Sequence, residues 1–190
     1  IEWVRRESVP SDILQTHPLL ASRQFIRVCV HRRENTNDRA RFTCYFDALE
    51  LLLRGGHSIL WVRLKGTDWA LRAWGLEERL QALEAEFPET LIVTEVWAHY
   101  RDVIESFLNY GMLATDSGSM QEEANALGVP CVTLRFGTDR GESLLAGGNV
   151  LAPPLSAEFV ATVIAEAFAH RADLVAEPIY GVNSAGQLVD

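Results

Sequence analysis

Residues 113–130 constrain the fold of this chain more than any other stretch. The stretch opens with an apolar run, continues through four small residues at 116–119, and ends at Gly128 and Pro130. Between these limits, apolar residues recur at helical spacing at Met120, Ala124 and Leu127. The pattern predicts the end of a buried strand, a tight turn, a helix, and a stop before the next strand.

The turn at 116–119 is compatible with a bound anion. Ser119 and Glu122 match a capping box, which predicts that the helix begins there. Small residues let a phosphate group come close, and the N-terminal end of a helix favours negative charge. An ordinary strand-to-helix connection has the same residues, so the turn alone leaves a structural and a functional interpretation open.

Six apolar runs are typical of buried strands, at 25–30, 58–62, 91–94, 112–115, 131–134 and 149–151. Helical patterns separate them, over 38–54, 68–87 with a break near Gly75, 99–110, 119–127 and 156–170. This alternation predicts an α/β fold: a doubly wound parallel six-stranded sheet of the Rossmann-like kind, with strand order 3-2-1-4-5-6. We expect residues 25–175 to form this domain, with a lead-in or interdomain segment at 1–24 and a tail at 176–190.

Composition narrows the class of protein. With 190 residues, 48% of them hydrophobic, the chain is long enough for one domain with a substantial core. A net charge of −9 argues against nucleic acid as a partner, because phosphate backbones require a basic face. No apolar run approaches the ~20 residues that span a bilayer, and no signal-peptide pattern opens the chain. We expect a cytoplasmic protein with no membrane partner, and the helix-like opening at Ile1 suggests a fragment.

Neither a metal nor a cofactor is expected. The three cysteines lack Cys-x-x-Cys spacing and lie in apolar runs, so we interpret them as buried thiols: Cys29, Cys44 and Cys131. His57, His99 and His170 show no metal-ligand spacing. The sequence also contains no Gly-x-Ser-x-Gly elbow and no Gly-x-x-x-x-Gly-Lys phosphate loop.

The predicted strand order brings two polar loops together. Strands 25–30 and 112–115 become neighbours at the topological switch point, where ligands bind outside the carboxyl ends of the strands. Those ends carry the charged segment 31–34 and the turn 116–119, and the loop that contains Arg140 borders the same crevice. This juxtaposition favours the functional interpretation of both loops.

For individual side chains of these loops, both a contact with a ligand and an ordinary structural role remain open. His31 can donate to a phosphate or cap its own loop, and Arg140 can neutralise a diphosphate or be a plain surface residue. Because Arg32 and Arg33 are adjacent, at most one of them is expected to face the crevice, and the other is a solvated charge or an ion-pair partner that contributes little.

Two carboxylates, Glu122 and Glu123, fall in the first turn of the predicted helix. There they are favourable to the helix dipole whatever the function. Only one can face the crevice, where it would repel phosphate but accept hydrogen bonds from ribose hydroxyls. This arrangement points to the nucleoside end of a ligand.

Three groups of residues occur together in an order and spacing typical of one known family. They are 31–35, 115–124 with 127–130 behind it, and Arg135 with 138–142. From about Phe25 to Tyr180 the chain resembles the non-hydrolysing UDP-N-acetylglucosamine 2-epimerase family. The resemblance implies the C-terminal, nucleotide-binding half of a two-domain fold of the glycosyltransferase-B kind, whose partner is the N-terminal half of the same protein.

Family members interconvert UDP-N-acetylglucosamine and UDP-N-acetylmannosamine by eliminating UDP and adding it back. By resemblance, the diphosphate, the phosphate cradle and the ribose would be held by His31, Arg33, Ser117, Gly118, Ser119, Glu123 and Arg140. The acidic residues that transfer protons belong to the N-terminal half, so this chain alone is expected to catalyse nothing. Family members are commonly homodimers, which implies a possible homodimer here.

The chain departs from the family pattern at several positions. Ser119, Asp139, Gly141 and Val103 stand where the family has Gly, Glu, Pro and Phe, and the position of Val103 is on the uracil side. These departures indicate a divergent member or one with altered specificity. Two alternatives remain open: a glycosyltransferase of the same architecture, and a non-catalytic nucleotide-sugar sensor or structural domain.

Overall fold

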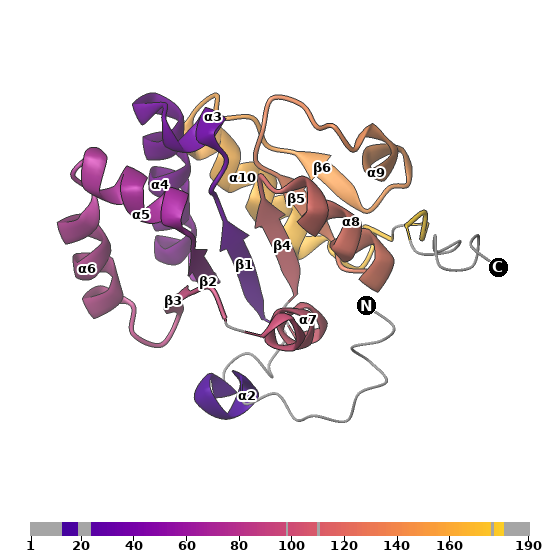
Figure 1. Ribbon diagram of the computed structural model, residues 1–190, viewed down its shortest axis with the longest axis horizontal. Helices are drawn as coiled ribbons and strands as arrows, with labels where there is room; N and C mark the ends of the chain where they lie inside the picture. The colour runs from indigo at the N-terminus through magenta and orange to yellow at the C-terminus, as the bar shows by residue number, and fades with distance from the viewer. Residues whose placement is uncertain (1–12, 19–23, 98, 110, 176, 181–190) are drawn as a thin grey trace.

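The apolar runs form one parallel sheet in the computed structural model of the chain (Figure 1). Its strands are β1 (Phe25–Cys29), β2 (Ser58–Arg63), β3 (Leu91–Glu95), β4 (Met112–Thr115), β5 (Cys131–Thr133) and β6 (Asn149–Leu151). Their order, β3-β2-β1-β4-β5-β6, confirms the predicted order and the Rossmann-like α/β fold. The structure describes residues 13–18, 24–97, 99–109, 111–175 and 177–180, so most of the expected lead-in segment and tail lie outside the described residues.

Helices cover both faces of the sheet (Figure 1). They are α2 (Ile13–Thr16), α3 (Arg33–Thr36), α4 (Arg39–Arg54), α5 (Lys65–Ala73), α6 (Glu77–Glu86), α7 (Tyr100–Asn109), α8 (Gly118–Leu127), α9 (Gly141–Leu145) and α10 (Ala157–Ala169). Successive side chains of a strand point to opposite faces. Ile26 and Val28 therefore pack with α4, α5, α6 and α10, and Phe25 packs with α7 and α8. None of the described helices has both the length and the apolar character needed to cross a bilayer.

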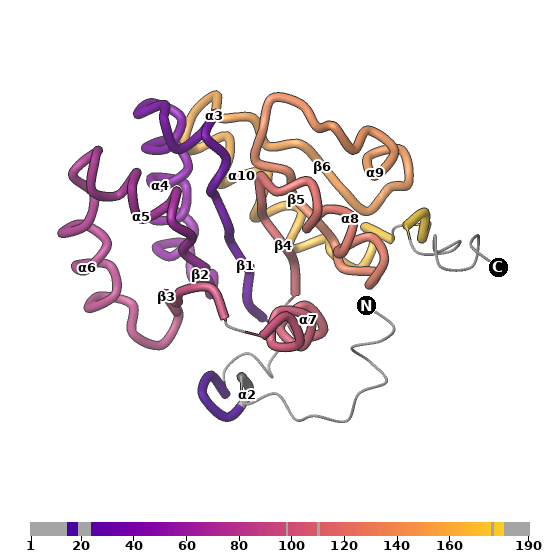
Figure 2. Tube along the Cα trace, viewed as in Figure 1, coloured from indigo at the N-terminus to yellow at the C-terminus, as the bar shows by residue number. Residues whose placement is uncertain are grey.

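The central strands β1 and β4 place the two loops that follow them side by side, at the carboxyl ends of the strands. All residues of both strands are buried, as expected for parallel strands covered on both faces. Their register aligns Cys29 with Thr115, so the residues that follow each strand emerge together. Figure 2 shows the chain leaving both strands on this side of the sheet, from β1 toward α3 and from β4 toward α8.

Some local predictions were wrong. Cys44, expected as a buried thiol, is only half-buried on α4. Helix α8 begins at Gly118 after an extended N-cap residue, Ser117, so the capping box based on Ser119 does not form. Because α8 begins earlier, the hydroxyl of Ser119 lies inside the helix and approaches the hydroxyl of Ser117 instead. The charged segment 31–34, expected as a polar loop after the first strand, runs into the one-turn helix α3, which starts after an extended N-cap residue, Arg32.

Gly128 ends α8 in the left-handed conformation, with φ 68°. The replacement Gly128→Ala is expected to lower the free energy of unfolding by about 1–2 kcal/mol, because a Cβ is strained in this region. Urea unfolding followed by circular dichroism measures the change. Gly137→Ala is the matched control, because its backbone is outside the left-handed region and the added Cβ meets nothing within 4 Å. An equal loss in both variants would contradict the expectation.

Candidate functional site

Asp116 joins the loops that follow β1 and β4. It comes directly after β4 and is fully buried. Its carboxylate accepts hydrogen bonds from the backbone N–H of His31 at 3.0 Å and of Arg32 at 2.9 Å, and from the side-chain amide of Asn35 at 3.0 Å. All three donors belong to the segment after β1. The carboxylate therefore fixes that segment against the end of β4.

The imidazole of His31 is held by the same carboxylate. Its Nδ1 lies 3.0 Å from Oδ1 of Asp116 and 3.7 Å from Sγ of Cys29. The hydrogen bond with Asp116, and then that with Cys29, raises the pKa of His31 to about 10, although partial burial acts in the opposite direction. The ring is therefore a cation at neutral pH, and its Nε2–H is used in neither contact.

The turn between β4 and α8 is fixed by two hydrogen bonds. The N–H of Ser117 donates to Oγ1 of Thr115 at 3.1 Å, and the side-chain amide of Gln121 donates to the carbonyl of Ser117 at 3.1 Å. The hydroxyls of Ser117 and Ser119 lie 3.2 Å apart. The first N–H groups of a helix have no acceptor within the helix, and the first turn of α8 contains no acidic residue. Hydroxyls and helix N–H groups together suit an anion.

Gly118 lies beside side chains of two other loops, those of Arg32 and Asp139. A Cβ at this position would be 3.3 Å from Nη2 of Arg32 and 3.6 Å from Oδ1 of Asp139. The guanidinium of Arg32 donates to Asp139 at 3.3 Å. Arg32 thus reaches the turn, whereas Arg33 is exposed at the first position of α3. Of the two adjacent arginines, Arg32 is the one beside the crevice.

A hollow of about 250 Å³ lies between these loops. Its polar lining includes His31, Ser117, Ser119 and Glu123. Most of the remaining wall is apolar and is formed by Val62, Leu64, Val96, Trp97, Val103 and Met120. The hollow therefore joins an end suited to an anion to a largely apolar chamber.

The two carboxylates of α8 have different surroundings, as expected. Glu123 lines the hollow and accepts a hydrogen bond from the hydroxyl of Tyr100 at 2.8 Å, and burial raises the pKa of its carboxyl. Glu122 pairs with the guanidinium of Arg140. Both lie beyond the first turn of α8, because the helix begins earlier than predicted. Only Glu123 is placed to meet a ligand in the hollow.

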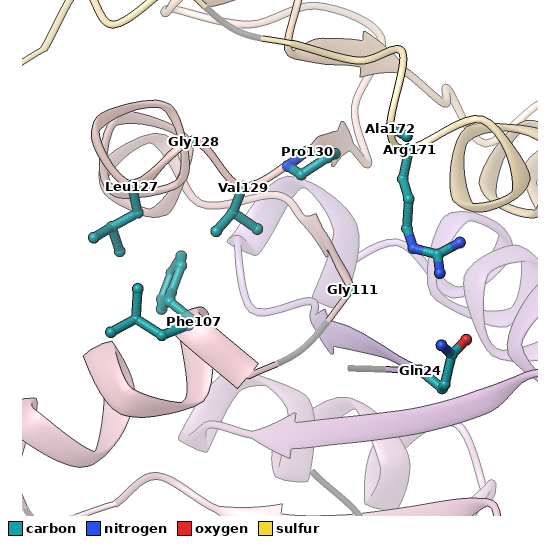
Figure 3. Close-up of a pocket in the computed structure, with 10 residues that line it drawn as sticks. Gln24, Phe107, Gly111, Leu127, Gly128, Val129, Pro130, Arg171 and Ala172 are labelled. Atoms are coloured by element: carbon teal, nitrogen blue, oxygen red, sulfur yellow. The ribbon is translucent and has the colours of Figure 1, made fainter. Parts of the chain in front are cut away.

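A second hollow, of about 390 Å³, lies at the amino ends of the central strands (Figure 3). Gln24, Gly111 and Pro130 line it, and these residues precede β1, β4 and β5. Among its lining residues, only Arg171 carries a charge. Ligands of such folds bind at the carboxyl ends of the strands rather than at their amino ends. Of these two hollows, the first is therefore the candidate site.

A family model described as UDP-N-acetylglucosamine 2-epimerase matches residues 2–189. The chain belongs to this family. It is similar to the UDP-2,3-diacetamido-2,3-dideoxy-D-glucuronate 2-epimerase of Pseudomonas aeruginosa, with 31% identity over 138 residues, which cover 72% of this chain and 36% of that protein. It is also similar to a UDP-N-acetylglucosamine 2-epimerase of Methanocaldococcus jannaschii, with 28% identity over 128 residues, which cover 67% of this chain and 33% of that protein.

Solved structures share the fold of this epimerase-family domain. The crystal structure of the Methanocaldococcus jannaschii UDP-GlcNAc 2-epimerase in complex with UDP-GlcNAc and UDP matches with a TM-score of 0.80 and 20% identity. The match covers 99% of this chain and 49% of that chain. The present chain therefore spans about half the length of that solved relative and about a third of the two curated relatives.

The structure of the epimerase-family domain brings most of the predicted site residues together. His31, Ser117, Ser119 and Glu123 line the candidate hollow, and Gly118 stands between two of these residues in the chain. The described residues contain no group of three or more His, Cys, Asp or Glu side chains that could hold a metal ion.

Two of the predicted site residues, Arg33 and Arg140, do not line the hollow. Arg33 is exposed on α3, and the guanidinium of Arg140 is already paired with Glu122 and lies 3.8 Å from a carboxylate oxygen of Asp139. To contact a diphosphate, Arg140 would have to leave Glu122. The roles of Arg33 and Arg140 stay predictions.

The sequence interpretation missed Arg27 and Trp97, which also line the hollow. Arg27 is a charged residue inside the first apolar run, and strand periodicity puts it on the same face as Cys29 and His31. That periodicity was the available signal for Arg27. Trp97 follows β3 in a loop, where its direction had no signature in the sequence.

The raised pKa of His31 predicts a pH-dependent stability. The pKa is about 10 in the folded chain and ~6.5 in an unfolded one, so the folded chain holds the extra proton between these values. The stabilisation is fully present below about pH 6.5 and is lost as the pH rises toward 10. Urea unfolding of the wild type and of His31→Gln at about pH 6 and about pH 9 tests this. The difference between the two proteins should shrink at the higher pH, and a constant difference would contradict the expectation.

Proposed function

We propose that this domain binds the nucleotide of a UDP-sugar, with the diphosphate between His31 and the first turn of α8. The observation that carries the proposal is the convergence of His31, Ser117 and Ser119 on one hollow from two loops distant in the sequence. Curated relatives named as epimerases of UDP-sugars support the choice of ligand.

Each group at the proposed site has a chemical task. The His31 cation donates Nε2–H to a phosphate oxygen in a charge-assisted hydrogen bond. The hydroxyls of Ser117 and Ser119, and the first N–H groups of α8, donate to other phosphate oxygens. Glu123 accepts from ribose hydroxyls, as acidic residues do in dinucleotide sites, and the apolar chamber takes the base.

The chain spans only part of its relatives, so the activity of the complete polypeptide is a further proposal. We propose that it interconverts a UDP-2-acetamido sugar and its C2 epimer by eliminating UDP and adding it back. A base removes the proton from C2, the bond between C1 and the UDP oxygen breaks, and a C1=C2 double bond forms, which gives the glucal intermediate. A proton then adds to the opposite face of C2 and the UDP oxygen bonds to C1 again. In this chain, the positive charge of His31 stabilises the UDP that departs. The acids and bases are supplied by the remainder of the polypeptide.

Two measurements test these proposals. Calorimetry of the 190-residue chain with UDP is expected to show binding, weaker than that of the complete polypeptide. NMR of UDP-N-acetylglucosamine in D₂O with the complete polypeptide is expected to show deuterium at C2 and the appearance of the C2 epimer. A polypeptide that binds UDP but transfers the sugar to an acceptor would be a glycosyltransferase, and one that leaves the sugar unchanged would be a sensor. Either result would contradict the proposed epimerisation.

A further inference from the structure

Tyr100 links the two helices that form neighbouring walls of the candidate hollow. It is the first residue of α7, and Val103, one turn further along α7, lines the hollow. Met120 and Glu123 line it from α8, again one turn apart. The hydroxyl of Tyr100 donates to Oε1 of Glu123 at 2.8 Å. Tyr100 is not itself one of the lining residues, so it acts on the hollow through Glu123.

The core of the domain does not depend on the Tyr100 hydroxyl. Tyr100 is 46% exposed, whereas Phe107 of α7 and Ala124 of α8 are fully buried and belong to the same apolar cluster. The two helices are therefore held against the sheet by their apolar faces. Removal of the hydroxyl alone should leave the fold intact.

The hydroxyl of Tyr100 favours the charged form of Glu123. Glu123 is half-buried, and burial raises the pKa of its carboxyl, while the hydrogen bond from Tyr100 and the charge of Arg27 act in the opposite direction. An ionised carboxylate accepts hydrogen bonds at both oxygens and donates none. The hydrogen bond also restrains the glutamate side chain, so less conformational freedom is lost when a ligand binds.

We propose that Tyr100 is a positioning residue that holds the Glu123 carboxylate for the 2′- and 3′-hydroxyls of a ribose, and so makes the site selective for ribonucleotides. The inference rests on the proposed function, because it takes Glu123 to meet the ribose. A carboxylate has about four acceptor sites, so two hydroxyl donors can bind beside the hydroxyl of Tyr100. The 2′-hydroxyl is the group by which a protein distinguishes ribose from deoxyribose.

Calorimetry with UDP and 2′-deoxy-UDP tests the assignment on the 190-residue chain and on Tyr100→Phe. The wild type is expected to bind UDP about 10- to 100-fold more tightly, because 2′-deoxy-UDP lacks one hydrogen bond to a charged group. Tyr100→Phe removes one oxygen atom and keeps the ring. Its Kd for UDP should rise about 2- to 10-fold, the factor of one ordinary hydrogen bond. The Kd for 2′-deoxy-UDP should rise less, so the preference for UDP narrows.

A double-mutant cycle separates a positioning role of Tyr100 from a structural one. Glu123→Ala should abolish the preference for UDP. Because Tyr100 acts through Glu123, adding Tyr100→Phe to Glu123→Ala should change neither Kd. A purely structural role of Tyr100 would instead weaken both nucleotides, and would do so with or without Glu123. Thermal unfolding verifies that each variant is folded.

Tyr180→Phe is the matched control. The hydroxyl of Tyr180 donates to the carboxylate of Glu142, so this variant removes the same kind of hydrogen bond. Neither Tyr180 nor Glu142 lines the hollow. The ratio of the two Kd values should therefore equal that of the wild type.

The outcomes that overturn the inference differ from those that overturn the proposed function. A wild-type chain that binds UDP and 2′-deoxy-UDP equally overturns the role of Tyr100 but leaves nucleotide binding intact. The same holds if Tyr100→Phe keeps the full preference, or if it weakens both nucleotides equally. Binding of neither nucleotide by the wild type overturns the nucleotide site itself.

Discussion

Replacing Asp116 with Ala is expected to lower the free energy of unfolding by about 3–5 kcal/mol. The carboxylate is fully buried and accepts hydrogen bonds from the backbone of His31 and Arg32 and from the side chain of Asn35. Its removal leaves these donors without their acceptor and leaves the His31 cation without its counter-charge. Urea unfolding at neutral pH, followed by circular dichroism, measures the loss.

Asp68→Ala is the matched control for Asp116→Ala. The Asp68 carboxylate pairs with Arg63 at 2.8 Å, but both side chains are partly exposed. Ion pairs near the surface contribute about 0–1 kcal/mol, so this variant should lose little stability. A similar, small loss in both variants would mean that Asp116 does not hold the two loops together.

The variant His31→Gln is expected to weaken UDP binding by about 10- to 100-fold. Glutamine removes the cation, while the backbone N–H of residue 31 can still donate to Asp116. The expected factor is that of one hydrogen bond between charged groups, about 1.5–3 kcal/mol. Calorimetry with UDP measures the change in Kd. Because UDP and CDP share the diphosphate, CDP binding should weaken by the same factor.

His170→Gln is the control for His31→Gln. His170 is an exposed histidine just after α10 and lies outside the hollow. Its replacement should leave the Kd for UDP unchanged. Full UDP affinity in a folded His31→Gln variant would exclude His31 from the diphosphate site.

The sheet could be predicted because its central strands are buried on both faces. Such strands appear as continuous apolar runs, and β1 and β4 are buried at every residue. Right-handed crossovers then restrict the strand order, and this order placed the segment after Cys29 beside the turn after Thr115. The position of the candidate site followed from topology, before any side-chain contact was known.

The side-chain partners could not be predicted in the same way. Asp116 was part of a phosphate-compatible turn in the sequence, yet its carboxylate is turned inward because three donors of the neighbouring loop converge on it. The pairing of Arg140 with Glu122 joins residues of α8 and of the loop before α9, and no local pattern encodes it. Such contacts depend on the relative positions of separate loops, which periodicity does not determine.

The central claim is that the loops after β1 and β4 hold one diphosphate between them. A crystal structure of the chain grown with UDP tests it most directly. The account predicts phosphate density within hydrogen-bonding distance of His31 Nε2 and of the Ser117–Ser119 turn at once. Phosphate density that touches only one of these loops, or UDP bound at the amino ends of the strands, would contradict it.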